Sequence, residues 1–75
     1  MQDKFFLDNI NKLFSKKKFN EVIIKIKKNN QFLENYPDLF NISGVSKILK
    51  FDNSKSDIIS ALQDFENYFL NSKAD

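Results

Sequence analysis

The sequence contains two similar blocks in tandem, and this repeat constrains the fold more than any other feature. Phe6 and Ile10 of the first block correspond to Phe40 and Gly44 of the second, an offset of 34 residues. In each block one apolar helical stripe leads through a short polar turn into another. A repeat period of roughly 20–50 residues is typical of helical units stacked in series. We therefore expect an all-α protein that offers binding surfaces rather than an active site.

Apolar residues recur at three- and four-residue intervals and predict four helices. Pro37 should end the second helix and open the third, because its missing N–H is not needed there. Short connections between the helices imply antiparallel neighbours. We expect one domain over 1–75, built of two stacked antiparallel hairpins with repeats at about 3–36 and 37–72. The expected helices cover about 3–16, 20–35, 38–51, and from the turn at 52–54 to about 72.

Two local patterns add detail to the second block. Gly44 lies in the middle of the third expected helix, where it costs about 1 kcal/mol relative to alanine. A glycine is best tolerated there if another helix approaches closely. Ser54 and Asp57 are spaced as a capping box at the start of the fourth helix, with Asp in place of the usual Glu.

These residues resemble the tetratricopeptide repeat family. The family places a large residue and a small one four apart on its first helix, then a turn and an aromatic residue, and ends near a proline. Ile10 departs from the pattern because a small residue is expected there, and its bulk should push the first two helices apart. The closing proline falls about three residues late, and the second turn is longer than usual. The matching segments are Phe40-x3-Gly44, Lys17-Lys18-Phe19-x-x-Val22, Ala61-x3-Phe65-x2-Tyr68 and Tyr36-Pro37.

The resemblance implies a protein–protein interaction module, or scaffold, with a concave groove lined by the first and third helices. Asparagine amides can donate to and accept from a peptide backbone, and Leu or Phe side chains supply apolar contacts. In a two-repeat protein these apolar residues can equally form the core. The resemblance also suggests the N-terminal part of a longer bacterial repeat protein. The groove residues it implies are Leu7, Asn11, Phe14, Asn41, Val45 and Ile48.

The fourth helix supports a second hypothesis. A single preceding hairpin cannot bury all of Phe65, Tyr68 and Phe69. Terminal repeats normally carry a polar outer face. The aromatic face is therefore expected to contact further repeats or a second copy of the chain. In the second case the protein is a small self-associating helical bundle with a structural or regulatory role, comparable to an antitoxin.

Composition excludes several function classes. The chain has no Cys, no His and a single Gly, so thiol or imidazole chemistry and glycine-rich phosphate loops are ruled out. We expect no enzyme activity, no metal and no cofactor. All 12 basic residues are Lys and the net charge is only +2, which argues against a nucleic-acid partner. No apolar run approaches the ~20 residues of a membrane span, and a cytoplasmic location is expected. The frequent Lys, Asn, Ile and Phe residues suggest an A/T-rich genome.

Overall fold

The computed structural model describes residues 2–72, and over that range the chain forms four α-helices, one 3-10 helix and no strand. The all-α prediction is confirmed. Residues 1 and 73–75 of the expected 1–75 domain lie outside the described residues. The elements are α1 (Gln2–Ser15), α2 (Phe19–Lys28), the 3-10 helix η1 (Asn30–Phe32), α3 (Asp38–Leu49) and α4 (Lys55–Ser72).

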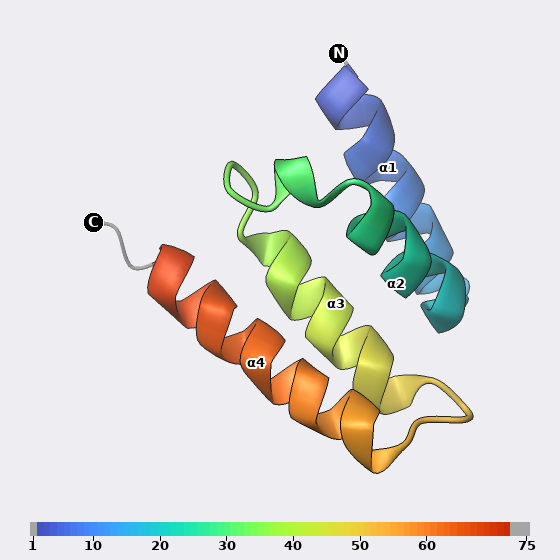
Figure 1. Ribbon diagram of the computed structural model, residues 1–75. Coiled ribbons are helices and arrows are strands. Elements are labelled where there is room, and N and C mark those ends of the chain that lie inside the picture. The colour runs from blue at the N-terminus through green and yellow to red at the C-terminus, as the bar shows by residue number, and fades with distance from the viewer. Residues whose placement is uncertain (1, 73–75) are drawn as a thin grey trace.

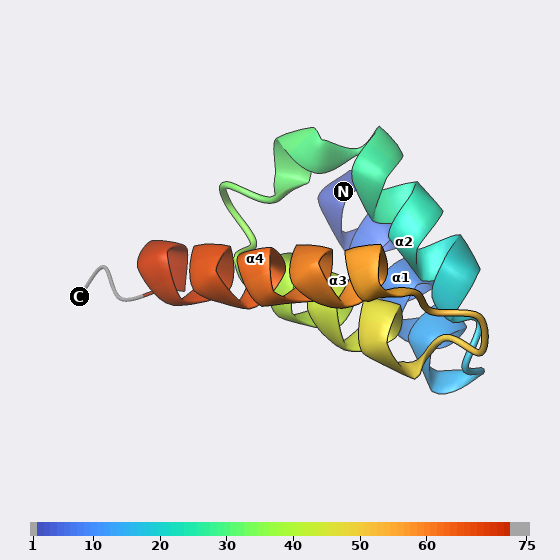
Figure 2. The ribbon, with the colours of Figure 1, turned by 60° about the horizontal axis from the view of Figure 1, so that its bottom comes forward.

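The helices form two antiparallel pairs. Figure 1 shows α1 running beside α2 and α3 beside α4, with α2 next to α3. Figure 2 shows the chain leaving α2 through η1 and a loop before it enters α3. Each helix thus packs mainly against the helix that follows it in sequence, and α3 with α4 is the most extensive of these contacts.

The hydrophobic core lies among the first three helices. Ile10 of α1, Val22 and Ile26 of α2, and Leu39 of α3 are at most 3% exposed. α4 contributes one small buried residue, Ala61. The partly buried residues that pack around the core cluster are Phe6, Leu7, Leu13, Phe14, Phe32, Leu33, Tyr36 and Ile42.

The turn between α1 and α2 closes α1 with a Schellman motif. The Lys18 N–H donates to the Leu13 carbonyl at 3.0 Å, and the Lys17 N–H donates to the Phe14 carbonyl at 2.9 Å. This arrangement requires a left-handed residue, and Lys17 has a φ of 63°. Glycine is usual at this position because a side chain there is strained. Lys17 therefore stores local strain that a glycine would remove.

The predicted second helix, over 20–35, is wrong at its C-terminal end because α2 stops at Lys28. Asn29 leaves the helical conformation, and its side-chain amide donates to the Lys25 carbonyl at 2.8 Å. Asparagine competes for backbone groups in this way and favours helix ends. The chain then turns through η1, which allows Phe32 to stack on Phe6 with ring centroids 4.7 Å apart. The ring contact requires a path that a continuous helix would not follow.

The contact predicted for Gly44 is confirmed. A Cβ built on Gly44 would lie 2.6 Å from Cε1 of Phe65, so α4 approaches α3 at a distance that only glycine permits. Ile10 occupies the corresponding position in α1 and is fully buried. The first pair of helices packs less extensively than the second, and α2 is the shortest of the four α-helices.

The predicted start of the fourth helix is also confirmed. The Ser54 N–H donates to Asp57 Oδ2 at 2.9 Å, and the Asp57 N–H donates to Ser54 Oγ at 3.3 Å. The hydrogen bond from the Ser54 backbone and the nearby Lys50 ammonium lower the pKa of Asp57 below its usual 3.8. The third helix ends at Leu49, two residues before the expected end, because Lys50 adopts an extended conformation.

Candidate functional site

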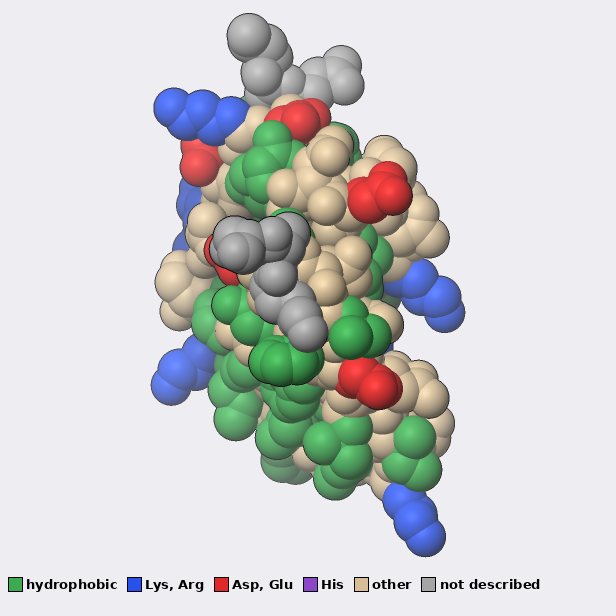
Figure 3. Space-filling view, turned by 90° about the vertical axis from the view of Figure 1, so that its left-hand side faces the viewer, with side chains coloured by type: hydrophobic (Ala, Val, Ile, Leu, Met, Phe, Trp, Pro, Cys, Tyr) green, Lys and Arg blue, Asp and Glu red, His purple; other side chains and the backbone are tan. Residues whose placement is uncertain are grey.

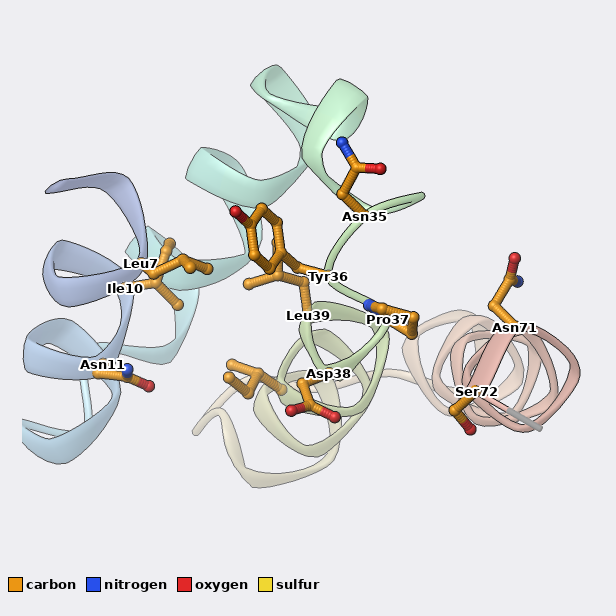
Figure 4. A pocket seen from close by; sticks show the side chains of 11 residues that line it. Leu7, Ile10, Asn11, Asn35, Tyr36, Pro37, Asp38, Leu39, Asn71 and Ser72 are labelled. Atoms are coloured by element: carbon orange, nitrogen blue, oxygen red, sulfur yellow. The ribbon is translucent and has the colours of Figure 1, made fainter. Parts of the chain in front are cut away.

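A cleft of about 510 Å³ lies where α1, the turn before α3 and the end of α4 meet. Its size falls within the range of about 300–1,000 Å³ that is usual for ligand sites. We call it the α1–α3 cleft. Figure 4 shows Leu7 and Ile10 pointing from α1 toward Tyr36 and Leu39. The lining residues are Leu7, Ile10, Asn11, Asn35, Tyr36, Pro37, Asp38, Leu39, Ile42, Asn71 and Ser72.

The floor of the cleft is continuous with the core. Ile10 is fully buried and Leu39 is 1% exposed, and both side chains belong to the core cluster with Val22 and Ile26 of α2. Leu7 and Ile42 are half-buried and pack against the same core. Packing of this kind fixes the shape of an apolar floor before any ligand arrives, which lowers the entropic cost of binding.

Tyr36 ties the far wall of the cleft to the start of α1. Its hydroxyl donates to Asp3 Oδ2 at 3.0 Å, across 33 residues of sequence. The hydrogen bond to Asp3, burial and the negative charge of Asp3 together raise the pKa of Tyr36 above its usual 10.0. The bond and the Phe6–Phe32 stack hold the segment before α3 over α1, and so set the width of the cleft.

The rim of the cleft is polar and carries negative charge. Asn11, Asn35 and Asn71 are exposed and offer amide donors and acceptors from three different segments. Of the described residues that line the cleft, Asp38 alone is charged. A second carboxylate, Asp3, accepts the hydrogen bond from the Tyr36 hydroxyl. The local field therefore favours a ligand that combines an apolar group with a positive charge.

The structure divides the six residues predicted to form a groove. Leu7 and Asn11 line the α1–α3 cleft. Phe14 packs edge-on against Phe19, with ring centroids 5.7 Å apart, and belongs to the surroundings of the core. The three α3 residues Asn41, Val45 and Ile48 do not line the cleft. The α3 residues that line its apolar part are Leu39 and Ile42.

The three aromatic residues predicted to form a contact face on α4 also differ from one another. Phe65 is half-buried against Gly44, Tyr68 is half-buried, and Phe69 is 63% exposed. Phe65 therefore serves mainly to join α4 to α3. Phe69 lies on the outer face of α4 together with other exposed apolar residues, which were not predicted to form a contact face.

A second cleft, of about 420 Å³, lies between α2 and α4 and is polar. Lys47 Nζ donates to Asp64 Oδ2 at 2.7 Å and to Ser60 Oγ at 2.8 Å, and Ser43 Oγ donates to the same Asp64 oxygen at 2.9 Å. An ammonium that donates to a carboxylate has no lone pair with which to take a proton from Ser60. The cluster therefore joins α3 to α4 rather than forming a nucleophile with its base.

Neither this polar cluster nor most of the cleft rim was predicted from the sequence. Asn35, Asp38 and Asn71 come from a loop, a helix start and a helix end, and no spacing in the sequence connects them. The sequence predicts Tyr36 and Pro37 only as the end of the first repeat and Pro37 as the boundary between the second and third helices. A sequence pattern that predicts a turn does not indicate that the residues of the turn will line a cleft.

No protein-family model, curated protein or solved structure matches this chain. Among the described helices none is both long and apolar enough to cross a membrane. Within residues 2–72 no three acidic side chains gather in a way that could hold a metal ion.

Proposed function

We propose that the chain is a protein–protein interaction module whose α1–α3 cleft binds a short peptide segment of a partner protein. The proposal includes the stacked-hairpin arrangement expected of a tetratricopeptide-like repeat and a cytoplasmic location. One observation carries it: within residues 2–72 the cleft combines a preformed apolar floor with a rim of three asparagines and one carboxylate, and no lysine of that range lines it. The expected ligand carries a leucine-sized side chain next to a lysine or arginine.

Each part of the cleft has a role in this binding. The floor around Leu7 and Leu39 would receive the apolar side chain, because burial of apolar area drives such contacts. The asparagine amides would pair with the peptide backbone, which has both donors and acceptors. Asp38 would attract the basic residue. As an exposed ion pair this contact contributes little affinity, and it mainly sets the preference for charge.

The experiment is a titration of the isotope-labelled chain with three short capped peptides, followed by NMR. The first peptide alternates lysine and leucine, the second replaces lysine by glutamate, and the third replaces leucine by serine. We expect the first peptide to shift the side-chain amides of Asn11, Asn35 and Asn71. The glutamate and serine peptides should bind more weakly.

A matched pair of variants tests the charge preference. Asp38→Asn should weaken binding of the lysine–leucine peptide about two- to fivefold, the effect of one exposed ion pair. Asp52→Asn makes the same change at an exposed turn residue outside the cleft and should leave binding unchanged. Shifts that map away from the cleft, or equal binding of the lysine and glutamate peptides, would show that the proposal is wrong.

A further inference from the structure

The outer face of α4 exposes large apolar side chains along most of the helix. Ile58, Ile59, Leu62, Phe69 and Leu70 are between 43% and 63% exposed. Figure 3 shows hydrophobic side chains gathered over the side of the molecule on which α4 lies. Soluble proteins rarely leave such a continuous apolar face in water unless it makes a contact.

Two opposite charges bound the centre of this face. Lys55, Ile59, Leu62 and Glu66 follow one another at intervals of four, three and four residues within α4. Such spacing places all four on one stripe of the helix. Among the described residues, neither Lys55 nor Glu66 has an ion-pair partner. The stripe thus reads positive, apolar, apolar, negative over three helical turns.

This order is self-complementary when two copies of α4 run antiparallel. A two-fold axis midway along the stripe brings Lys55 opposite Glu66 of the second copy, and Ile59 opposite its Leu62. Each contact then occurs twice, as symmetric dimers require. A parallel pairing would instead place Lys55 against Lys55 and Glu66 against Glu66. We propose that this face binds a second copy of the chain, with the two α4 helices antiparallel.

The available area sets the strength of this dimer. Five large side chains that are about half exposed offer roughly 100 Å² each, so the pair would bury on the order of 1,000 Å². That area lies at the low end of specific interfaces, where contacts are transient. We therefore expect a dissociation constant in the micromolar range or weaker. The proposal is independent of the α1–α3 cleft, whose peptide binding can succeed or fail separately.

The decisive experiment reverses one charge at a time and then mixes the variants, with sedimentation equilibrium as the readout. Lys55→Glu and Glu66→Lys should each weaken self-association about tenfold or more, because both ion pairs of the dimer become repulsive. An equimolar mixture of the two variants restores both attractive pairs, and the double variant restores them within one chain. Both should associate about as well as the natural sequence. The double variant excludes a parallel dimer: in that arrangement the mixture would also associate, but the double variant would not, because residue 55 would still face residue 55 and residue 66 would face residue 66.

Two further variants test the apolar part of the face. Leu62→Asp should abolish self-association, whereas Gln63→Asp, at an exposed neighbour off the stripe, should leave it nearly unchanged. Circular dichroism on each variant confirms that the helices persist. A natural chain that stays monomeric up to about millimolar concentration, or a dimer indifferent to Leu62→Asp, overturns the proposal. So does a mixture of the charge variants that fails to associate.

Discussion

Gly44 is in close contact with Phe65. Whether Gly44→Ala stabilises or destabilises the fold tests how firmly this contact is held. In an isolated helix, Gly→Ala stabilises by about 1 kcal/mol because alanine loses less backbone entropy. At Gly44 the new methyl carbon would lie 2.6 Å, 2.9 Å and 3.0 Å from three ring carbons of Phe65. Carbon atoms prefer separations of about 3.5–4.0 Å, so the ring or the helix must move by roughly 1 Å.

The cost of that movement should exceed the gain in helix propensity. Overpacking typically costs about 1–3 kcal/mol, and a conflict with three ring atoms belongs in the upper part of that range. We expect Gly44→Ala to destabilise the fold by about 1–2 kcal/mol. For a domain of this size each kcal/mol lowers the melting temperature by about 4–8 °C. Urea and thermal unfolding followed by circular dichroism measure both quantities.

A double-mutant cycle separates the two effects. Phe65→Ala removes the ring and should cost about 1–3 kcal/mol, less than a fully buried phenylalanine. In that background Gly44→Ala meets no obstacle and should stabilise by about 1 kcal/mol. The effect of Gly44→Ala on folding stability therefore changes sign: it destabilises when residue 65 is Phe and stabilises when residue 65 is Ala. If Gly44→Ala stabilises the natural chain, the ring is not held against α3 and the reasoning is refuted.

Predictions at four other positions each rest on a single residue. Lys17→Gly should stabilise the fold by about 0.5–1 kcal/mol, because glycine relieves the left-handed strain, whereas Lys17→Ala should not. Ser46 is fully buried and its hydroxyl has no hydrogen-bond partner among the described residues. Ser46→Ala should therefore stabilise by about 1 kcal/mol, and Ser43→Ala, which loses a bond to Asp64, should destabilise by a similar amount; urea unfolding measures both. Because folding lowers the pKa of Asp57, its stabilising effect relative to Asp57→Asn should be complete above about pH 4 and lost as the pH falls through the lowered value. Unfolding midpoints that differ equally at pH 7 and pH 2 would contradict this.

Local signals in the sequence were sufficient to predict the features that depend on few residues. The capping box needs only Ser54 and Asp57, and both hydrogen bonds form. Gly44 predicted the close approach of another helix, because a glycine inside a helix lowers helix stability and is best tolerated where a larger side chain would not fit. The all-α class followed from periodicity over long segments. In each case the deciding energy is local or belongs to one contact.

The features that were mispredicted depend on tertiary contacts. The apolar pattern continues through Phe32, Leu33 and Tyr36 and suggested one long second helix. The chain instead bends after Lys28 so that Phe32 reaches Phe6. Such a contact outweighs helix propensity, which amounts to less than about 1 kcal/mol for most residues.

The groove residues show why a site is harder to predict than a fold. One step along a helix turns a side chain by about 100°, so a small difference in helix rotation exchanges Asn41 for Ile42 on the wall of the cleft. The rim residues Asn35 and Asn71 come together only because α4 ends beside the turn before α3. No spacing in the sequence encodes that proximity.

Because each helix packs mainly against its successor, the chain has consequences for folding kinetics. Contacts between sequence neighbours close short loops, and chains dominated by such contacts fold within microseconds to milliseconds. α1 and α2 can pair before α3 has been synthesised, and α4 can dock onto α3 last, guided by the fit between Phe65 and Gly44. The order of the helices therefore suits folding that proceeds from the N-terminus to the C-terminus during translation.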